Sequence, residues 1–220
     1  MQETTQQLNL PDGRAVTAIW TPPAGTPGWA FVYAPGAGSN VRDPFGALAA
    51  RELAPHGIGT LRFQFPYSEA GRKAPDREPV LEATWRAAIA ATLDRGGRLV
   101  VGGRSMGGRI ASQVVSQGER VDALALFAYP LHPPGRPERR RDSHLAKLDA
   151  PALFCSGTND AFASPDELRG LTAVVPGSLL HLLEGADHGF AVPKSSGRTR
   201  QDVWMEAASA LRDWLAALDA

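Results

Sequence analysis

The stretch VVGGRSMGGRI, residues 100–110, places one serine among four glycines. The apolar residues before it predict a strand, and the apolar residues after it recur at helical spacing. A serine at a sharp strand-to-helix turn adopts a strained backbone, and residues two positions away approach the turn too closely for a β-carbon. Gly103 and Gly107 occupy those two positions and complete the pattern G-x-S-x-G. We therefore identify Ser105 as a candidate nucleophile.

Two other interpretations of this turn are weaker. A glycine-rich turn can simply save space, but here it joins a strand to a helix, as the nucleophile pattern requires. A phosphate-binding turn would need the Walker lysine and hydroxyl or the dinucleotide glycine spacing, and GGRSMGG has neither. No cofactor and no metal ion are therefore expected.

Short apolar runs alternate with helix-period segments along the rest of the chain, after a hairpin pattern around a Pro-Asp-Gly turn in residues 8–20. This order predicts an α/β fold: a mostly parallel sheet with helices on both faces and an N-terminal antiparallel hairpin. Without an internal repeat or a long linker, we expect one domain over residues 1–220 and no large lid. The runs expected to form the parallel strands are 30–33, 60–63, 99–101, 123–127, 152–155 and 179–183.

The composition excludes several classes of function. The 220 residues carry a formal net charge of zero, which argues against general attraction to nucleic acid or an anionic membrane. The basic run RPERRR, residues 136–141, is interpreted as a solvated loop, with an anionic-substrate contact as the alternative. One cysteine, no signal-peptide pattern and no apolar run near the roughly 20 residues of a membrane span predict a cytoplasmic protein. We expect a monomer or a small homo-oligomer.

A serine nucleophile needs a base, and histidine in a loop after the last strand is well placed to reach it. His188 lies in such a loop, within EGADHGF. His181 is the alternative, but it lies inside the strand pattern LLHLLE. We therefore predict that His188 is the base.

The acid that orients the histidine is expected after the preceding strand, since the chain order on this scaffold is serine, acid, histidine. Asp160, in GTND, follows the run 152–155. Asp187 is the alternative, but neighbouring side chains rarely face each other well enough to bond. A turn role for Asp160, beside Asn159, also stays open.

An acyl-transfer site also needs amides that bind the oxyanion. We assign one to Met106, directly after the serine, and the second to Ala37 in YAPGAGSN, residues 33–40. Loops at the same edge of the sheet are expected to line a substrate pocket. The candidate pocket residues are Gly36, Gly38, Tyr67, Arg72, Tyr129 and His132.

These motifs together resemble the α/β-hydrolase superfamily. The resemblance is carried by YAPGAGSN, GGRSMGGR, GTND and GADHGF, and it runs from about residue 8 to the C-terminus. The chain is most similar to the lidless, dienelactone-hydrolase-like branch and to a group that includes the hydrolase-like domain of a non-specific-lethal chromatin subunit. The resemblance implies an eight-stranded sheet and a triad of Ser105, Asp160 and His188. Dienelactone hydrolases use a cysteine where this chain has Ser105.

The function predicted from these residues is hydrolysis of a small ester or thioester through an acyl-serine intermediate, in an esterase-like enzyme. Two alternatives are an acyltransferase that uses the same triad and a binding or scaffold protein that keeps the fold without turnover. The expected partner is a small ester-type molecule.

Overall fold

Eight strands form one sheet in the computed structural model, which describes residues 2–219. Their order across the sheet is β1-β2-β4-β3-β5-β6-β7-β8. The β1–β2 and β2–β4 pairs are antiparallel and the other pairs are parallel, which confirms the predicted fold class. The strands are β1 (Thr4–Asn9), β2 (Ala15–Thr21), β3 (Trp29–Ala34), β4 (Ile58–Phe63), β5 (Arg98–Arg104), β6 (Ala123–Phe127), β7 (Ala152–Gly157) and β8 (Leu179–Leu183).

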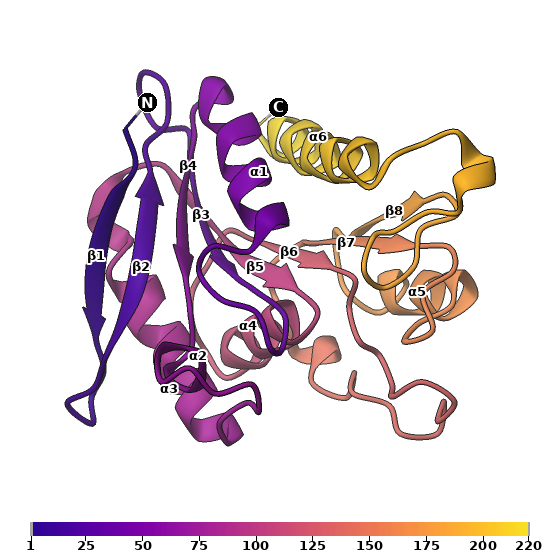
Figure 1. Ribbon diagram of the computed structural model, residues 1–220, viewed down its shortest axis with the longest axis horizontal. Coiled ribbons are helices and arrows are strands. Elements are labelled where there is room, and N and C mark those ends of the chain that lie inside the picture. Colours follow the sequence, from indigo (N-terminus) through magenta and orange to yellow (C-terminus); the bar gives the residue numbers. More distant parts are fainter. Residues whose placement is uncertain (1, 220) are drawn as a thin grey trace.

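Helices cover both faces of this sheet (Figure 1). The helices α1 and α6 pack on one face, and α3, α4 and α5 pack on the other. Short 3₁₀ turns lie at 54–56, 93–95, 145–147 and 194–196. The helices are α1 (Pro44–Leu53), α2 (Pro66–Glu69), α3 (Glu78–Ala90), α4 (Met106–Ser116), α5 (Pro165–Thr172) and α6 (Arg200–Leu218).

Local sequence explains where several helices begin. Asp43 caps α1 by accepting a hydrogen bond from the Gly46 amide, and Pro44 follows at the first helical position. Ser164 and Glu167 form a capping box at the start of α5. Tyr67, which was predicted to lie in a loop at the edge of the sheet, lies in the single helical turn α2.

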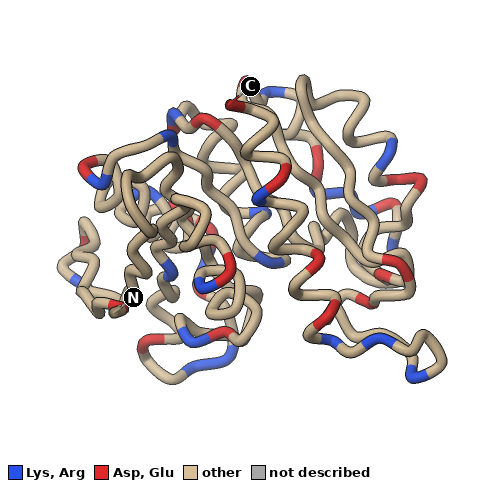
Figure 2. The backbone as a smooth tube through the Cα atoms, turned by 90° about the horizontal axis from the view of Figure 1, so that it is seen from above, with Lys and Arg blue, Asp and Glu red and all other residues tan. Residues whose placement is uncertain are grey.

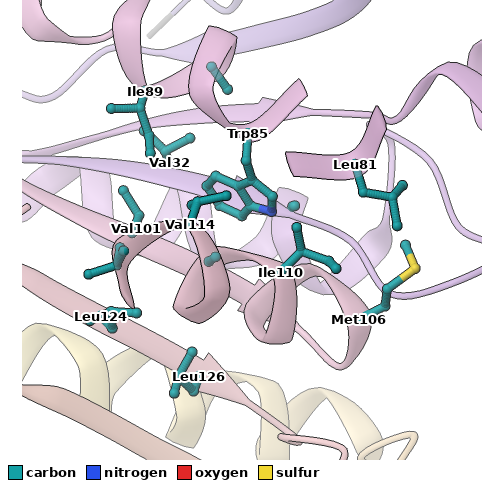
Figure 3. Close-up of a cluster of buried hydrophobic side chains, with 14 of the residues drawn as sticks. Val32, Leu81, Trp85, Ile89, Val101, Met106, Ile110, Val114, Leu124 and Leu126 are labelled. Carbon is teal, nitrogen blue, oxygen red and sulfur yellow. The ribbon is translucent and has the colours of Figure 1, made fainter. Parts of the chain in front are cut away.

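The face covered by α3 and α4 holds the packing that supports the serine turn. Trp85 of α3 is fully buried and lies over Ile110 and Val114 of α4 (Figure 3). Its indole Nε1 donates a hydrogen bond of 3.1 Å to the carbonyl oxygen of Gly107. A buried indole needs such a partner, so this contact fixes the first turn of α4 against α3.

Charged residues of both signs are interspersed along the backbone trace (Figure 2). None of the helices within residues 2–219 has the length and hydropathy of a membrane span. The same residues hold no cluster of three or more His, Cys, Asp and Glu side chains arranged to bind a metal ion.

Candidate active site

Ser105 lies between the end of β5 and the start of α4, in a backbone conformation that side chains rarely adopt. Its φ is 51° and its ψ is −117°. Two close approaches surround it: a β-carbon added to Gly103 would lie 2.0 Å from the Ala34 carbonyl oxygen, and one on Gly107 would lie 2.2 Å from the same atom. The glycines of the G-x-S-x-G pattern therefore allow the end of β3 to pass directly beside the serine turn.

We expect Gly107→Ala to lower the free energy of unfolding by about 3 kcal/mol, because the new β-carbon overlaps backbone that cannot rotate away. Urea unfolding followed by circular dichroism measures this loss. Gly170→Ala in α5 is the matched control, since a β-carbon there meets nothing within 4 Å. That change should stabilise the protein by up to about 1 kcal/mol. Equal stability of Gly107→Ala and wild type would contradict the close approach.

His188 reaches the serine from the loop that follows β8. Its Nε2 lies 2.9 Å from the Ser105 Oγ, and its Nδ1 lies 2.8 Å from Asp160 Oδ2. An ionised carboxylate only accepts hydrogen bonds, so Nδ1 carries the proton. The neutral ring then has a lone pair on Nε2, which accepts the hydrogen bond that the Ser105 hydroxyl donates.

Asp160 follows β7, and its side chain is completely buried. Its Oδ1 accepts a second hydrogen bond, of 2.8 Å, from the Phe162 amide. The Phe162 ring stacks on the His188 ring, with 4.0 Å between the ring centres and 27° between their planes. A hydrogen bond at one edge and an aromatic face on one side thus hold the imidazole in a single orientation.

The loops that carry Asp160 and His188 are bound to each other. The Gly185 amide donates to Thr158 Oγ1 at 2.8 Å, and a β-carbon on Gly157 would lie only 2.0 Å from the Ala186 carbonyl oxygen. These contacts set the separation between the carboxylate and the imidazole through the backbone of both loops.

The alternative partners from the sequence lie elsewhere. His181 is on β8, and its Nε2 contacts Glu206 of α6 at 2.9 Å. Asp187 accepts hydrogen bonds from the Gly189 and Ala191 amides, so it braces its own loop.

Two residues beside the serine carry the backbone amides expected to bind the oxyanion. The loop that follows β3 lies against Ser105: a β-carbon on Gly36 would contact the serine Cβ at 3.5 Å. Ala37 in this loop and Met106 at the start of α4 both line the cleft beside the serine. Their amides donate to no acceptor among residues 2–219. Both are therefore available to an oxygen bound at Ser105.

A cleft of about 740 Å³ opens onto Ser105 and His188, and its wall differs from the predicted pocket. Of the six residues expected there, Gly36 is in the wall. Tyr129 is buried, and its hydroxyl donates to the Arg141 carbonyl oxygen at 2.7 Å. His132 is also buried, between the Pro133 carbonyl oxygen and Glu167.

The remaining three expected pocket residues lie outside the wall of the cleft. Tyr67 is buried in α2, and its hydroxyl oxygen accepts a hydrogen bond of 3.1 Å from the Gly38 amide. Tyr67 and Gly38 thus anchor the loop that holds Ala37. Arg72 is exposed and pairs with Asp76 at 2.6 Å, away from the serine.

Sequence reasoning missed much of the actual wall. Phe162 lies in the same loop after β7 as Asp160. Its position two residues after the acid could have indicated that it lines the cleft. The polar end of the cleft combines residues from three separate segments, which no single motif marks. Its members include Glu78, Arg109, Gln113, Arg141, Ser143 and His144.

A family model described as an alpha/beta hydrolase domain matches residues 27–216. The chain belongs to the alpha/beta hydrolase family. This match confirms the resemblance that the motifs predicted. Membership of the family also supports the view that this α/β hydrolase is a hydrolase.

Solved structures share the fold of this α/β hydrolase over nearly its whole length. An alpha-beta serine hydrolase homologue from Coxiella burnetii is 18% identical, with a TM-score of 0.74, and the match covers 100% of this chain and 99% of that one. A serine hydrolase without a lid from Xanthomonas campestris is 18% identical, with a TM-score of 0.75 and coverage of 97% and 95%. A dienelactone hydrolase from Anabaena variabilis is 19% identical, with a TM-score of 0.77 and coverage of 98% and 97%. At these identities the likeness shows the fold alone.

Proposed function

We propose that this protein is a serine esterase that cleaves a small ester or thioester through an acyl-serine intermediate. The observation that carries the proposal is the continuous chain of hydrogen bonds from Ser105 through His188 to the buried Asp160. Such a chain activates a hydroxyl that is otherwise a poor nucleophile.

In the proposed reaction, the Ser105 Oγ attacks the ester carbonyl carbon while its proton moves to His188 Nε2. The amides of Ala37 and Met106 bind the oxyanion of the tetrahedral intermediate. The intermediate collapses, the bond from the carbonyl carbon to the leaving oxygen breaks (or to sulfur, in a thioester), and His188 gives its proton to the departing atom. Asp160 keeps Nδ1 protonated and stabilises the imidazolium that forms between these steps.

Water completes the proposed cycle. His188 takes a proton from a water molecule, the hydroxide attacks the acyl-serine carbonyl, and the acid product leaves with Ser105 regenerated. The His188 side chain is 22% exposed, so water reaches the base directly from the cleft. This access favours hydrolysis over transfer of the acyl group to another acceptor.

A fluorophosphonate probe tests the nucleophile. We expect the probe to label wild type on the peptide that contains Ser105, and Ser105→Ala to take up no label. Ser39→Ala is the matched control, because Ser39 lines the same cleft and its hydroxyl contacts Asp43 instead of a histidine. That variant should be labelled like wild type. Equal labelling of Ser105→Ala and wild type would remove Ser105 as the nucleophile, and absence of label on both would favour a silent binding protein.

A further inference from the structure

The cleft extends well beyond the serine, along the exposed side of α4. Ser105, Arg109 and Gln113 follow one another at four-residue steps, which places them on one face of the helix. Arg141 and His144, from the segment between β6 and β7, line the same cleft. A substrate bound at Ser105 therefore has a second region of the site within reach, one to two helical turns from the reacting carbonyl.

Positive charge exceeds available negative charge in this wall. Three arginines line the cleft, and one of them, Arg109, pairs with Glu78 at 2.7 Å. The guanidinium groups of Arg104 and Arg141 form no ion pair with any of residues 2–219. Arg104 instead lies over the Phe190 ring, 5.6 Å from its centre.

The other acid in the wall is not free to neutralise these arginines. The carboxylate of Asp43 accepts hydrogen bonds from the Tyr33 hydroxyl at 2.7 Å and from the Gly46 amide at 2.9 Å. It also contacts the Ser39 hydroxyl at 3.2 Å. The hydrogen bonds of Asp43 thus go to Tyr33, Ser39 and the start of α1 rather than to an arginine of the cleft.

Arg141 is held in place by its backbone. Its amide donates to the Leu131 carbonyl oxygen at 2.8 Å, and its own carbonyl oxygen accepts from the buried Tyr129 hydroxyl at 2.7 Å. The side chain is half-buried. Burial, and next the charge of Arg109, lower the pKa of Arg141 from its ordinary value. Guanidinium groups nevertheless stay protonated in proteins, so Arg109 and Arg141 both line the cleft as cations, and Glu78 pairs with Arg109.

His144 adds no charge to this region. The Ser112 hydroxyl donates to the Arg109 carbonyl oxygen, so it accepts from His144 Nε2 at 2.8 Å. Burial, and next the charge of Arg109, lower the pKa of His144. The ring is therefore neutral at pH 7, and the electrostatic preference of this end of the cleft comes from the arginines.

We propose that the cleft selects esters that carry a carboxylate group, with Arg141 binding that carboxylate while Ser105 attacks the ester carbonyl. This inference rests on the proposed esterase function and adds the class of substrate. Arginine suits the role because its planar fork matches the two oxygens of a carboxylate. The proposal also changes the interpretation of the basic run 136–141. The last residue of the run, Arg141, lines the cleft, whereas Arg140 pairs with Asp142 outside the cleft.

The test compares kcat/KM for matched substrates with and without a carboxylate. In the first pair, 4-nitrophenyl hydrogen glutarate carries the carboxylate on its acyl group, and 4-nitrophenyl butyrate is the neutral match. In the second pair, 4-acetoxybenzoate carries the carboxylate on its leaving group, and phenyl acetate is the neutral match. We expect Arg141→Gln to lower the charged-to-neutral ratio of kcat/KM at least about tenfold for one of the two pairs, as loss of a charge-assisted contact predicts. Arg141→Lys should restore part of the charged-to-neutral ratio that Arg141→Gln loses. The control Arg140→Gln should leave the ratio within about twofold of wild type.

Salt gives a second measure of the same contact. Raising ionic strength from about 0.02 to 0.3 M should lower the ratio for wild type and leave it nearly constant for Arg141→Gln, because salt screens a partly exposed charge pair. An unchanged ratio in Arg141→Gln for both pairs would overturn the carboxylate site while leaving esterase activity in place. Absence of hydrolysis of all four esters by wild type would instead overturn the proposed function.

Discussion

Replacing His188 with alanine should lower kcat for 4-nitrophenyl acetate by about 10⁶-fold, the loss seen when a serine hydrolase is deprived of its general base. The reason lies in the 2.9 Å contact between Nε2 and the Ser105 hydroxyl, because no other base among residues 2–219 contacts that hydroxyl. Steady-state hydrolysis followed at 405 nm measures the effect.

Two further variants make the His188 experiment specific. His181→Ala removes a histidine of β8 that pairs with Glu206 of α6, and it should change kcat less than about twofold. The double variant Ser105→Ala/His188→Ala should be no slower than either single variant, because residues that act as a unit are not additive. A His188→Ala enzyme that retains a hundredth of wild-type activity would contradict the proposed base.

Asp160→Asn should lower kcat by about 10⁴-fold, with a much smaller change in KM. An asparagine amide can donate to Nδ1, which favours the tautomer with the proton on Nε2, and that ring cannot accept the serine proton. In the proposed mechanism the buried carboxylate also stabilises the imidazolium of the intermediate, which a neutral amide cannot do.

The control for Asp160→Asn is Asp166→Asn in α5. The Asp166 side chain is 93% exposed and pairs with Arg169 on the surface, so its loss should leave kcat unchanged. An Asp160→Asn enzyme within tenfold of wild type would show that the acid does little beyond packing.

Much of the fold could be predicted from sequence because its signals are local. Each predicted apolar run lies within an observed strand, and Asp43 with Pro44 marks the observed start of α1. Spacing along the chain also sufficed for the three residues of the candidate triad, since parallel strands bring the loops at their carboxyl ends to one edge. The structure brings Ser105, Asp160 and His188 together there.

The wall of the cleft could not be predicted in the same way, because it depends on side-chain direction. Tyr129 and His132 lie in a loop at the correct edge, but both turn into the protein and bond to backbone and to Glu167. Arg141, nine residues after His132, lines the cleft instead. Composition within a loop does not distinguish these outcomes, since polar residues suit both.

The hydroxyl of Ser105 and the imidazole of His188 are separated by 83 residues of chain, yet they touch. During synthesis, a ribosome-bound chain that has emerged only as far as α5 holds the nucleophile and the acid but lacks the base. Under the proposed mechanism, such an intermediate is chemically silent toward the esters around it. Hydrolytic competence then arrives late, when the last strand docks, so recovery of turnover after refolding reports completion of the native topology rather than formation of its early parts.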